Sequence, residues 1–101
     1  MKMTQGDSYS IDITIEHEGK PLDISEIELV EITLLNLTKT YPEEVSFSDG
    51  AFHFPLSQEE TMNLVPLLCP MQVRVKFTSG DVIGSEIQKI DVQRVLSKAV
   101  L

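Results

Sequence analysis

This chain of 101 residues contains no tryptophan, only one cysteine and no long hydrophobic run. Because Cys69 is alone, an intrachain disulfide and a thiolate metal cluster are both excluded. No apolar stretch approaches the roughly 18 residues that a membrane-spanning helix needs. The five glycines are scattered singly, so the Gly-rich loop of a phosphate site is missing too. We therefore expect one small domain that folds around a hydrophobic core alone.

Positive charge is also scarce, with eight lysines and arginines against sixteen aspartates and glutamates. The acidic excess lies in residues 1–60, which carry thirteen acids and three bases, whereas residues 61–101 carry three acids and five bases. Such a chain lacks the clustered cationic face that nucleic-acid binding requires. The uneven distribution would favour head-to-tail contacts with a neighbouring molecule, although solvated surface charge is the simpler interpretation.

Short segments with alternating apolar and polar residues make up most of the chain. This period of two predicts half-buried strands over residues 9–16, 45–48, 51–54, 71–77, 82–83 and 87–92. The Asp49-Gly50 pair between two of these segments is a strong signal for a β-hairpin. Gly84 is predicted to form a bulge between the last two strands.

Residues 27–40 are ambiguous, because their apolar positions change parity between Leu34 and Leu35. We expect either one strand with a β-bulge at that point or a strand covered on both faces. A helix starting at Ser25 is the alternative, but the density of β-branched residues favours a strand. Residues 23–26 resemble a capped short turn.

About seven short strands and one short helix, at about residues 58–64, predict an all-β fold. Turn signals recur about every 8–12 residues, which is typical of an Ig-like antiparallel β-sandwich. We assign residues 1–92 to this single domain and residues 93–101 to a C-terminal arm or short helix. A helical stripe supports the arm, and its apolar members are Val92, Val95, Leu96, Ala99 and Val100. The arm either packs back on its own domain or docks on a neighbouring subunit.

The segment HFPLSQEET, residues 53–61, has the highest density of reactive side chains. A small hydrolase centred on Ser57 or His53 is one hypothesis, but Ser57 lacks a Gly-x-Ser-x-Gly elbow. Ser57 and Glu60 instead have the spacing of a helix capping box. Phe52 and Phe54 should face the core, which turns His53 outward. We predict a strand end and a helix cap here, with no catalytic residues.

No cofactor and no metal ion are expected, because neither histidine has a second ligand at metal spacing. The remaining candidates are residues for contacts with other proteins. Arg74 and Lys76 lie on one strand face, as a solvated stripe or a surface for an acidic partner. The full set of candidate interface residues is His53, Arg74, Lys76, Val95, Leu96, Val100 and Leu101.

Several segments together resemble a known family. They read QGDSY, GKPLD, FPLSQEET, MQVRVKFTSGDVIGSEI and VLSKAVL. They are similar to small proteins encoded among the virion structural genes of phages and prophages of Gram-positive gut bacteria. The layout also resembles the Ig-like N-terminal domain of some phage baseplate proteins. Similar domains often enter the strand after the helix through a Pro-Gly turn, whereas residues 66–70 read PLLCP here.

The resemblance implies a non-enzymatic virion protein that acts in head decoration, head–tail joining or the tail. It would be made in the bacterial cytoplasm, reside in the virion, and bind other virion proteins or copies of itself as an oligomer. Neither nucleic acid nor a membrane is an expected partner. The alternative is a small acidic phage-encoded inhibitor that binds a host protein.

Overall fold

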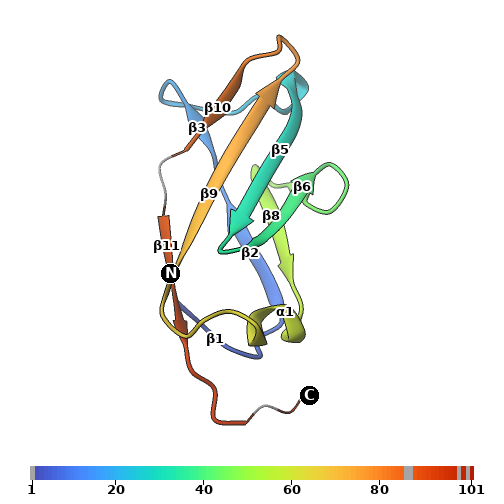
Figure 1. Ribbon diagram of the computed structural model, residues 1–101. Coiled ribbons are helices and arrows are strands. Elements are labelled where there is room, and N and C mark those ends of the chain that lie inside the picture. The colour runs from blue at the N-terminus through green and yellow to red at the C-terminus, as the bar shows by residue number, and fades with distance from the viewer. Residues whose placement is uncertain (1, 86–87, 98, 100) are drawn as a thin grey trace.

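The computed structural model describes residues 2–85, 88–97, 99 and 101, with the backbone alone for Gln88 and Lys89. Two sheets face each other (Figure 1). The larger runs in the order β1 (Lys2–Thr4), β11 (Gln88–Gln93), β9 (Leu68–Phe77), β5 (Ile27–Leu34) and β6 (Leu37–Tyr41), with β10 (Val82–Gly84) also paired to β9. The smaller runs in the order β2 (Tyr9–Ile13), β8 (Ala51–Leu56) and β7 (Ser46–Ser48). A two-residue ribbon joins β3 (Glu16–His17) to β4 (Lys20–Pro21).

This strand order confirms the predicted all-β sandwich of Ig-like type, in which two sheets enclose one core. One pair departs from the antiparallel arrangement, because β1 runs parallel to β11. Strand β1 itself was not predicted, since its three residues are too short for an alternating pattern. Its Met3 is nevertheless buried in the core.

The core lies between the two sheets and follows the alternation of the strands. Phe52 and Phe54 of β8 are almost completely buried and face Val30, Ile32 and Leu34 of the opposite sheet. Burying a large apolar side chain contributes about 1.5–3 kcal/mol. Because β8 alternates, its intervening His53 is placed on the outer face of the small sheet, as predicted.

Residues 27–40 form a hairpin, so the bulged single strand and the helix were both wrong. Strand β5 ends at Leu34, the chain turns at Leu35 with φ of 56°, and β6 begins at Leu37. The change of parity therefore marks a tight turn. A β-bulge does occur, but between Ile27 and Leu29. The predicted capped turn is confirmed as a 3₁₀ helix, Ile24–Glu26, whose cap Asp23 accepts from the Ser25 amide.

Strands β10 and β11 pair with the same edge of β9, with Gly84 opposite Arg74 and Gln88 opposite Met71. The bulge predicted between them at Gly84 stays a prediction, because residues 86 and 87 lie outside the described residues. Ser85 extends the contact with β9, because its amide donates to the Val73 carbonyl and its hydroxyl accepts from the Val73 amide.

Helix α1 (Gln58–Met62) is two residues shorter than predicted. Its last intrahelical bond comes from the Asn63 amide, and Pro66 prevents the helix from continuing. Of the two alternatives for residues 93–101, an arm or a short helix, the helix does not form in the described residues: Val92 lies buried in β11, and residues 94–97, 99 and 101 are irregular. Pairing with β1 keeps the chain extended as far as Gln93.

Candidate functional site

Three polar side chains on the outer face of the small sheet form a hydrogen-bonded chain. Asp12 of β2 lies directly opposite His53 of β8, and its carboxylate is 2.6 Å from His53 Nδ1. Ser48, at the end of β7, places its hydroxyl 2.7 Å from His53 Nε2. The connectivity is that of an Asp–His–Ser relay, so the structure gives His53 two partners that the sequence analysis did not predict.

The surroundings of His53 favour a doubly protonated imidazole. Nδ1 faces a carboxylate, which accepts, and Nε2 also lies 3.3 Å from the backbone carbonyl of Ser48, which only accepts. The hydrogen bond to Asp12 raises the pKa of His53 above its usual value, and this effect outweighs a smaller opposing effect of burial. With a proton on both nitrogens, His53 has no free lone pair to receive the Ser48 proton.

The site around this relay differs from that of a serine hydrolase in two respects. The carboxylate of Asp12 is 67% exposed, whereas the acid of a catalytic triad is buried and holds its imidazole in a dry environment. The relay also lies on an open sheet face, and neither Ser48 nor His53 lines any of the principal pockets among the described residues. The arrangement fits a polar cross-strand cluster better than a catalytic centre.

The predicted capping box is present in full. The Ser57 hydroxyl accepts from the Glu60 amide at 3.1 Å, and the Glu60 carboxylate accepts from the Ser57 amide at 2.9 Å. The same carboxylate oxygen accepts from Lys39 Nζ at 2.9 Å, and Lys39 also donates to the Pro55 carbonyl at 2.6 Å. Lys39 comes from β6, so the cap joins the two sheets through a contact that the sequence did not reveal.

Glu60 is held ionised by these contacts. Partial burial acts to raise its pKa, but the hydrogen bonds from the Ser57 amide and from Lys39 outweigh it and lower the pKa overall. Strand β8 continues through Pro55, which pairs with Ser10, as far as Leu56. The HFPLSQEET segment is therefore a strand, a cap and an inter-sheet contact.

Two buried polar residues close the end of the sandwich near α1. The Thr61 hydroxyl donates to the Asp7 carbonyl at 2.7 Å, and Gln5 Nε2 donates to the Leu64 carbonyl at 2.9 Å. The Val95 amide donates to Gln5 Oε1 at 3.3 Å. Both polar side chains are buried, and neither was predicted, because their partners lie far away in the sequence.

Arg74 and Lys76 point outward from β9, as predicted, but they do not form an uncompensated basic stripe. Arg74 lies 3.5 Å from the Glu31 carboxylate, and Lys76 lies 3.7 Å from that of Glu28. All four side chains are exposed by more than a third, so each pair contributes little to stability. The neighbouring strand β5 thus offsets the positive charge of Arg74 and Lys76.

The arm residues are placed in different environments. Val95 is half-buried, while Leu96 and Leu101 have completely exposed side chains. The Leu101 amide donates a hydrogen bond to Gln58 Oε1 at 2.7 Å, and the Leu101 carbonyl accepts one from Gln58 Nε2 at 3.2 Å. The described part of the arm therefore returns to its own domain at α1, as one of the two hypotheses held. Val100, the other candidate of the arm, lies outside the described residues.

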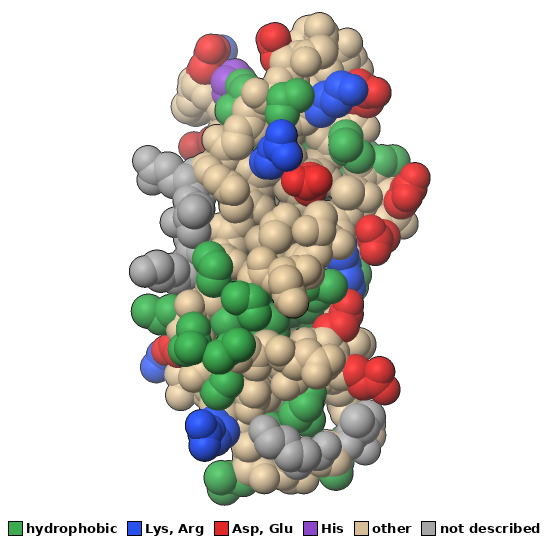
Figure 2. All heavy atoms as spheres, in the orientation of Figure 1, with side chains coloured by type: hydrophobic (Ala, Val, Ile, Leu, Met, Phe, Trp, Pro, Cys, Tyr) green, Lys and Arg blue, Asp and Glu red, His purple; other side chains and the backbone are tan. Residues whose placement is uncertain are grey.

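An exposed apolar patch, which the sequence analysis did not predict, lies beside α1. Figure 2 shows hydrophobic side chains gathered over the beginning of β9 and the loop before it. Val65, Leu67 and Leu68 are 43%, 52% and 52% exposed. We call these three residues the apolar patch. Leu67 and Leu68 belong to the PLLCP segment, whose Cys69 is buried and donates its thiol to the Val65 carbonyl.

Fold and surface together define a small Ig-like sandwich domain. Over the part of the chain that is described, no helix is long and apolar enough to cross a membrane. No group of three or more histidine, cysteine, aspartate or glutamate side chains among those residues could hold a metal ion. No family model, curated protein or solved structure matches this chain.

Proposed function

We propose that this protein is a non-enzymatic assembly component of a phage virion, acting through contacts with other virion proteins or with copies of itself. The observation that carries the proposal is the apolar patch, because half-exposed leucines grouped at one end of a small domain are typical of a protein–protein contact. The sequence resemblance to phage structural proteins supplies the virion context. Head decoration, head–tail joining and the tail remain the candidate positions.

A particle preparation tests this proposal. The tagged protein is expressed from its own phage or prophage, particles are purified through two density gradients, and the copy number per particle is measured by quantitative mass spectrometry. We expect a fixed ratio to the major capsid or tail protein in every fraction. Absence from particles, with the protein recovered on a single host protein, would instead support the acidic inhibitor.

The second candidate is a hydrolase. The hydrogen bonds of His53 with Asp12 and Ser48 favour a site centred on Ser48 over one centred on Ser57. Its test is turnover of a nitrophenyl ester by the wild-type chain and by Ser48→Ala. Turnover that disappears in Ser48→Ala, while His53 and the fold stay intact by NMR, would establish the hydrolase. Equal background rates in both proteins would support a structural relay.

A further inference from the structure

Strand β2 presents an unpaired edge to one side of the sandwich. It pairs with β8 on its other side and is the outermost strand of the small sheet in the described part of the chain. The N-terminal strand β1, which precedes it, pairs with β11 of the opposite sheet instead. An unpaired strand edge carries a row of free amide and carbonyl groups and can accept a further strand.

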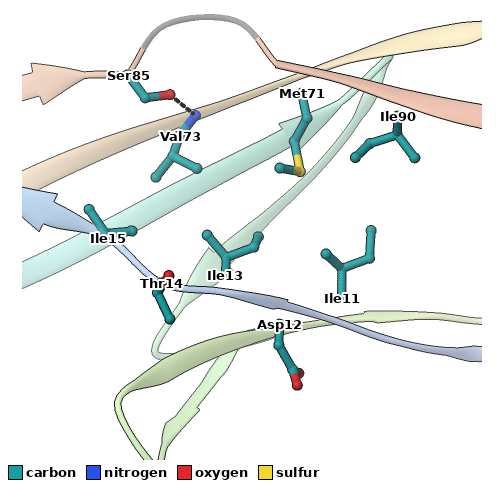
Figure 3. Close-up of a pocket in the computed structure, with 9 residues that line it drawn as sticks. All are labelled: Ile11, Asp12, Ile13, Thr14, Ile15, Met71, Val73, Ser85 and Ile90. Atoms are coloured by element: carbon teal, nitrogen blue, oxygen red, sulfur yellow. Dashed lines mark hydrogen bonds between the residues drawn. The ribbon is translucent and has the colours of Figure 1, made fainter. Parts of the chain in front are cut away.

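A groove of about 340 Å³ runs beside this edge, between β2 and the larger sheet. Figure 3 shows that the isoleucines of β2 point across the gap toward the side chains of β9 and β11, while Asp12 points the other way. The apolar lining consists of Ile11, Ile13, Ile15, Met71, Val73 and Ile90. A strand added to β2 would therefore cover part of the core with every second side chain.

Strand β2 carries one charged side chain, Asp12, which is 67% exposed and lies on the outer face beside His53. Like charges on facing strands are destabilising, whereas opposite charges stabilise the pair. The edge is therefore suited to a strand that carries a positive charge on its outer face.

The C-terminal segment of the chain has this character. Residues 94–101, RVLSKAVL, contain two bases, no acid and five apolar residues. In its own molecule Leu101 is hydrogen-bonded to Gln58 of α1, and the side chains of Leu96 and Leu101 remain exposed. We propose that residues 95–101 of one copy add as an antiparallel strand to β2 of a second copy.

An alignment with Lys98 beside Asp12 places Leu96 beside Thr14 and turns alternate residues of the segment toward the groove. Because each copy donates one segment and accepts another, the contact is head-to-tail and can build a ring or a chain of subunits. A second copy of the chain is thus the partner in the proposed assembly function, and the contact rests on that function. It is nevertheless tested on the purified protein, separately from incorporation into particles.

The first experiment is directed cross-linking. ¹⁵N-labelled Thr14→Cys and unlabelled Leu96→Cys are mixed under mild oxidation, and covalent dimers are identified by mass. We expect the mixed dimer to dominate over either homodimer, and the exposed Thr78→Cys control to give none with Leu96→Cys. A dominant Thr14→Cys homodimer would show β2–β2 pairing and overturn the proposal, as would the absence of any cross-link above the Thr78→Cys background.

The second experiment measures affinity with a fluorescent peptide RVLSKAVL and the chain truncated after Val95, which keeps the contact of Val95 with Gln5. We expect saturable binding that Asp12→Lys weakens about fivefold or more, in line with the change from an opposite to a like cross-strand charge. Glu43→Lys makes the same change of charge on an exposed loop and should leave the affinity unaltered. Equal affinities for both variants would contradict docking at β2.

Discussion

Single residues show how closely packing and ionisation are connected in this domain. The outward position of His53 follows from the alternation of β8, and the sequence predicted it. Its partners Asp12 and Ser48 could not be predicted, because they depend on which strands become neighbours and in which register. The Ser57–Glu60 cap is local and was predicted in full, whereas Lys39 reaches it from a strand about twenty residues earlier.

Asp12→Asn should lower the pKa of His53. The hydrogen bond to Asp12 is the main reason that this pKa lies above the ordinary 6.5, and an amide cannot supply the same charge. Because the folded-state pKa is raised, the contribution of His53 to stability is complete below about pH 6.5 and is lost as the pH rises through the raised value. NMR titration of the imidazole C–H signals gives the pKa directly.

The control is Asp81→Asn, which removes the same charge from an exposed turn in another part of the fold. It should leave the His53 titration in place. If Asp12→Asn and Asp81→Asn shift the pKa of His53 equally, the relay does not exist in solution.

Ser57→Ala should destabilise the domain by about 0.5–2 kcal/mol, the usual cost of losing an N-cap side chain. Glu60→Gln keeps a capping-box acceptor but loses the charged contact with Lys39, for which we expect about 1 kcal/mol at neutral pH. Because the pKa of Glu60 is lowered from 4.5, its contribution is present above pH 4.5 and disappears as the pH falls through the lowered value.

Urea denaturation at pH 7 and at pH 3 measures both effects. The difference between the wild-type chain and Glu60→Gln should narrow at the lower pH. Glu59→Gln is the matched control, since Glu59 is exposed in the same helical turn and has no contact with Lys39. A loss of stability in Glu59→Gln as large as in Glu60→Gln would contradict the role of the inter-sheet contact.

At the scale of elements, alternation and turn chemistry predicted the strands best where both signals agree. The Asp49-Gly50 hairpin is confirmed, with φ of 50° and 76° at its two turn residues. The Leu35 turn was missed because leucine rarely adopts positive φ and gives no turn signal. Strand β1 and the extended course of the chain to Gln93 depend on the pairing of β1 with β11, which local sequence does not encode.

Glu18→Asn should stabilise the domain by about 0.4–1 kcal/mol. Glu18 adopts φ of 54° ahead of Gly19 in the turn between β3 and β4, and asparagine tolerates this conformation better than glutamate. The melting temperature measures the effect. Glu16→Asn removes the same charge from strand β3 itself and should not be stabilising, so a rise in both variants would point to relieved charge repulsion.

At the scale of the whole molecule, several surface features take no part in holding the fold together. The core, the cap and the relay make their contacts within the domain. The side chains of the apolar patch and of Leu96 and Leu101 stay exposed, and the edge of β2 is unpaired among the described residues. Exposed apolar side chains of this kind are more typical of a contact between proteins than of a site for a small molecule.

Leu67→Glu should therefore reduce the copy number in purified particles at least severalfold while the isolated domain keeps its melting temperature. The Leu67 side chain is already 52% exposed, so a charge there costs the fold little but opposes burial in a contact. Val82→Glu is matched in exposure, at 52%, and lies outside the patch on β10. Its copy number should stay near that of the wild-type chain. Equal losses in both variants would mean that the added negative charge, and not the apolar patch, controls incorporation.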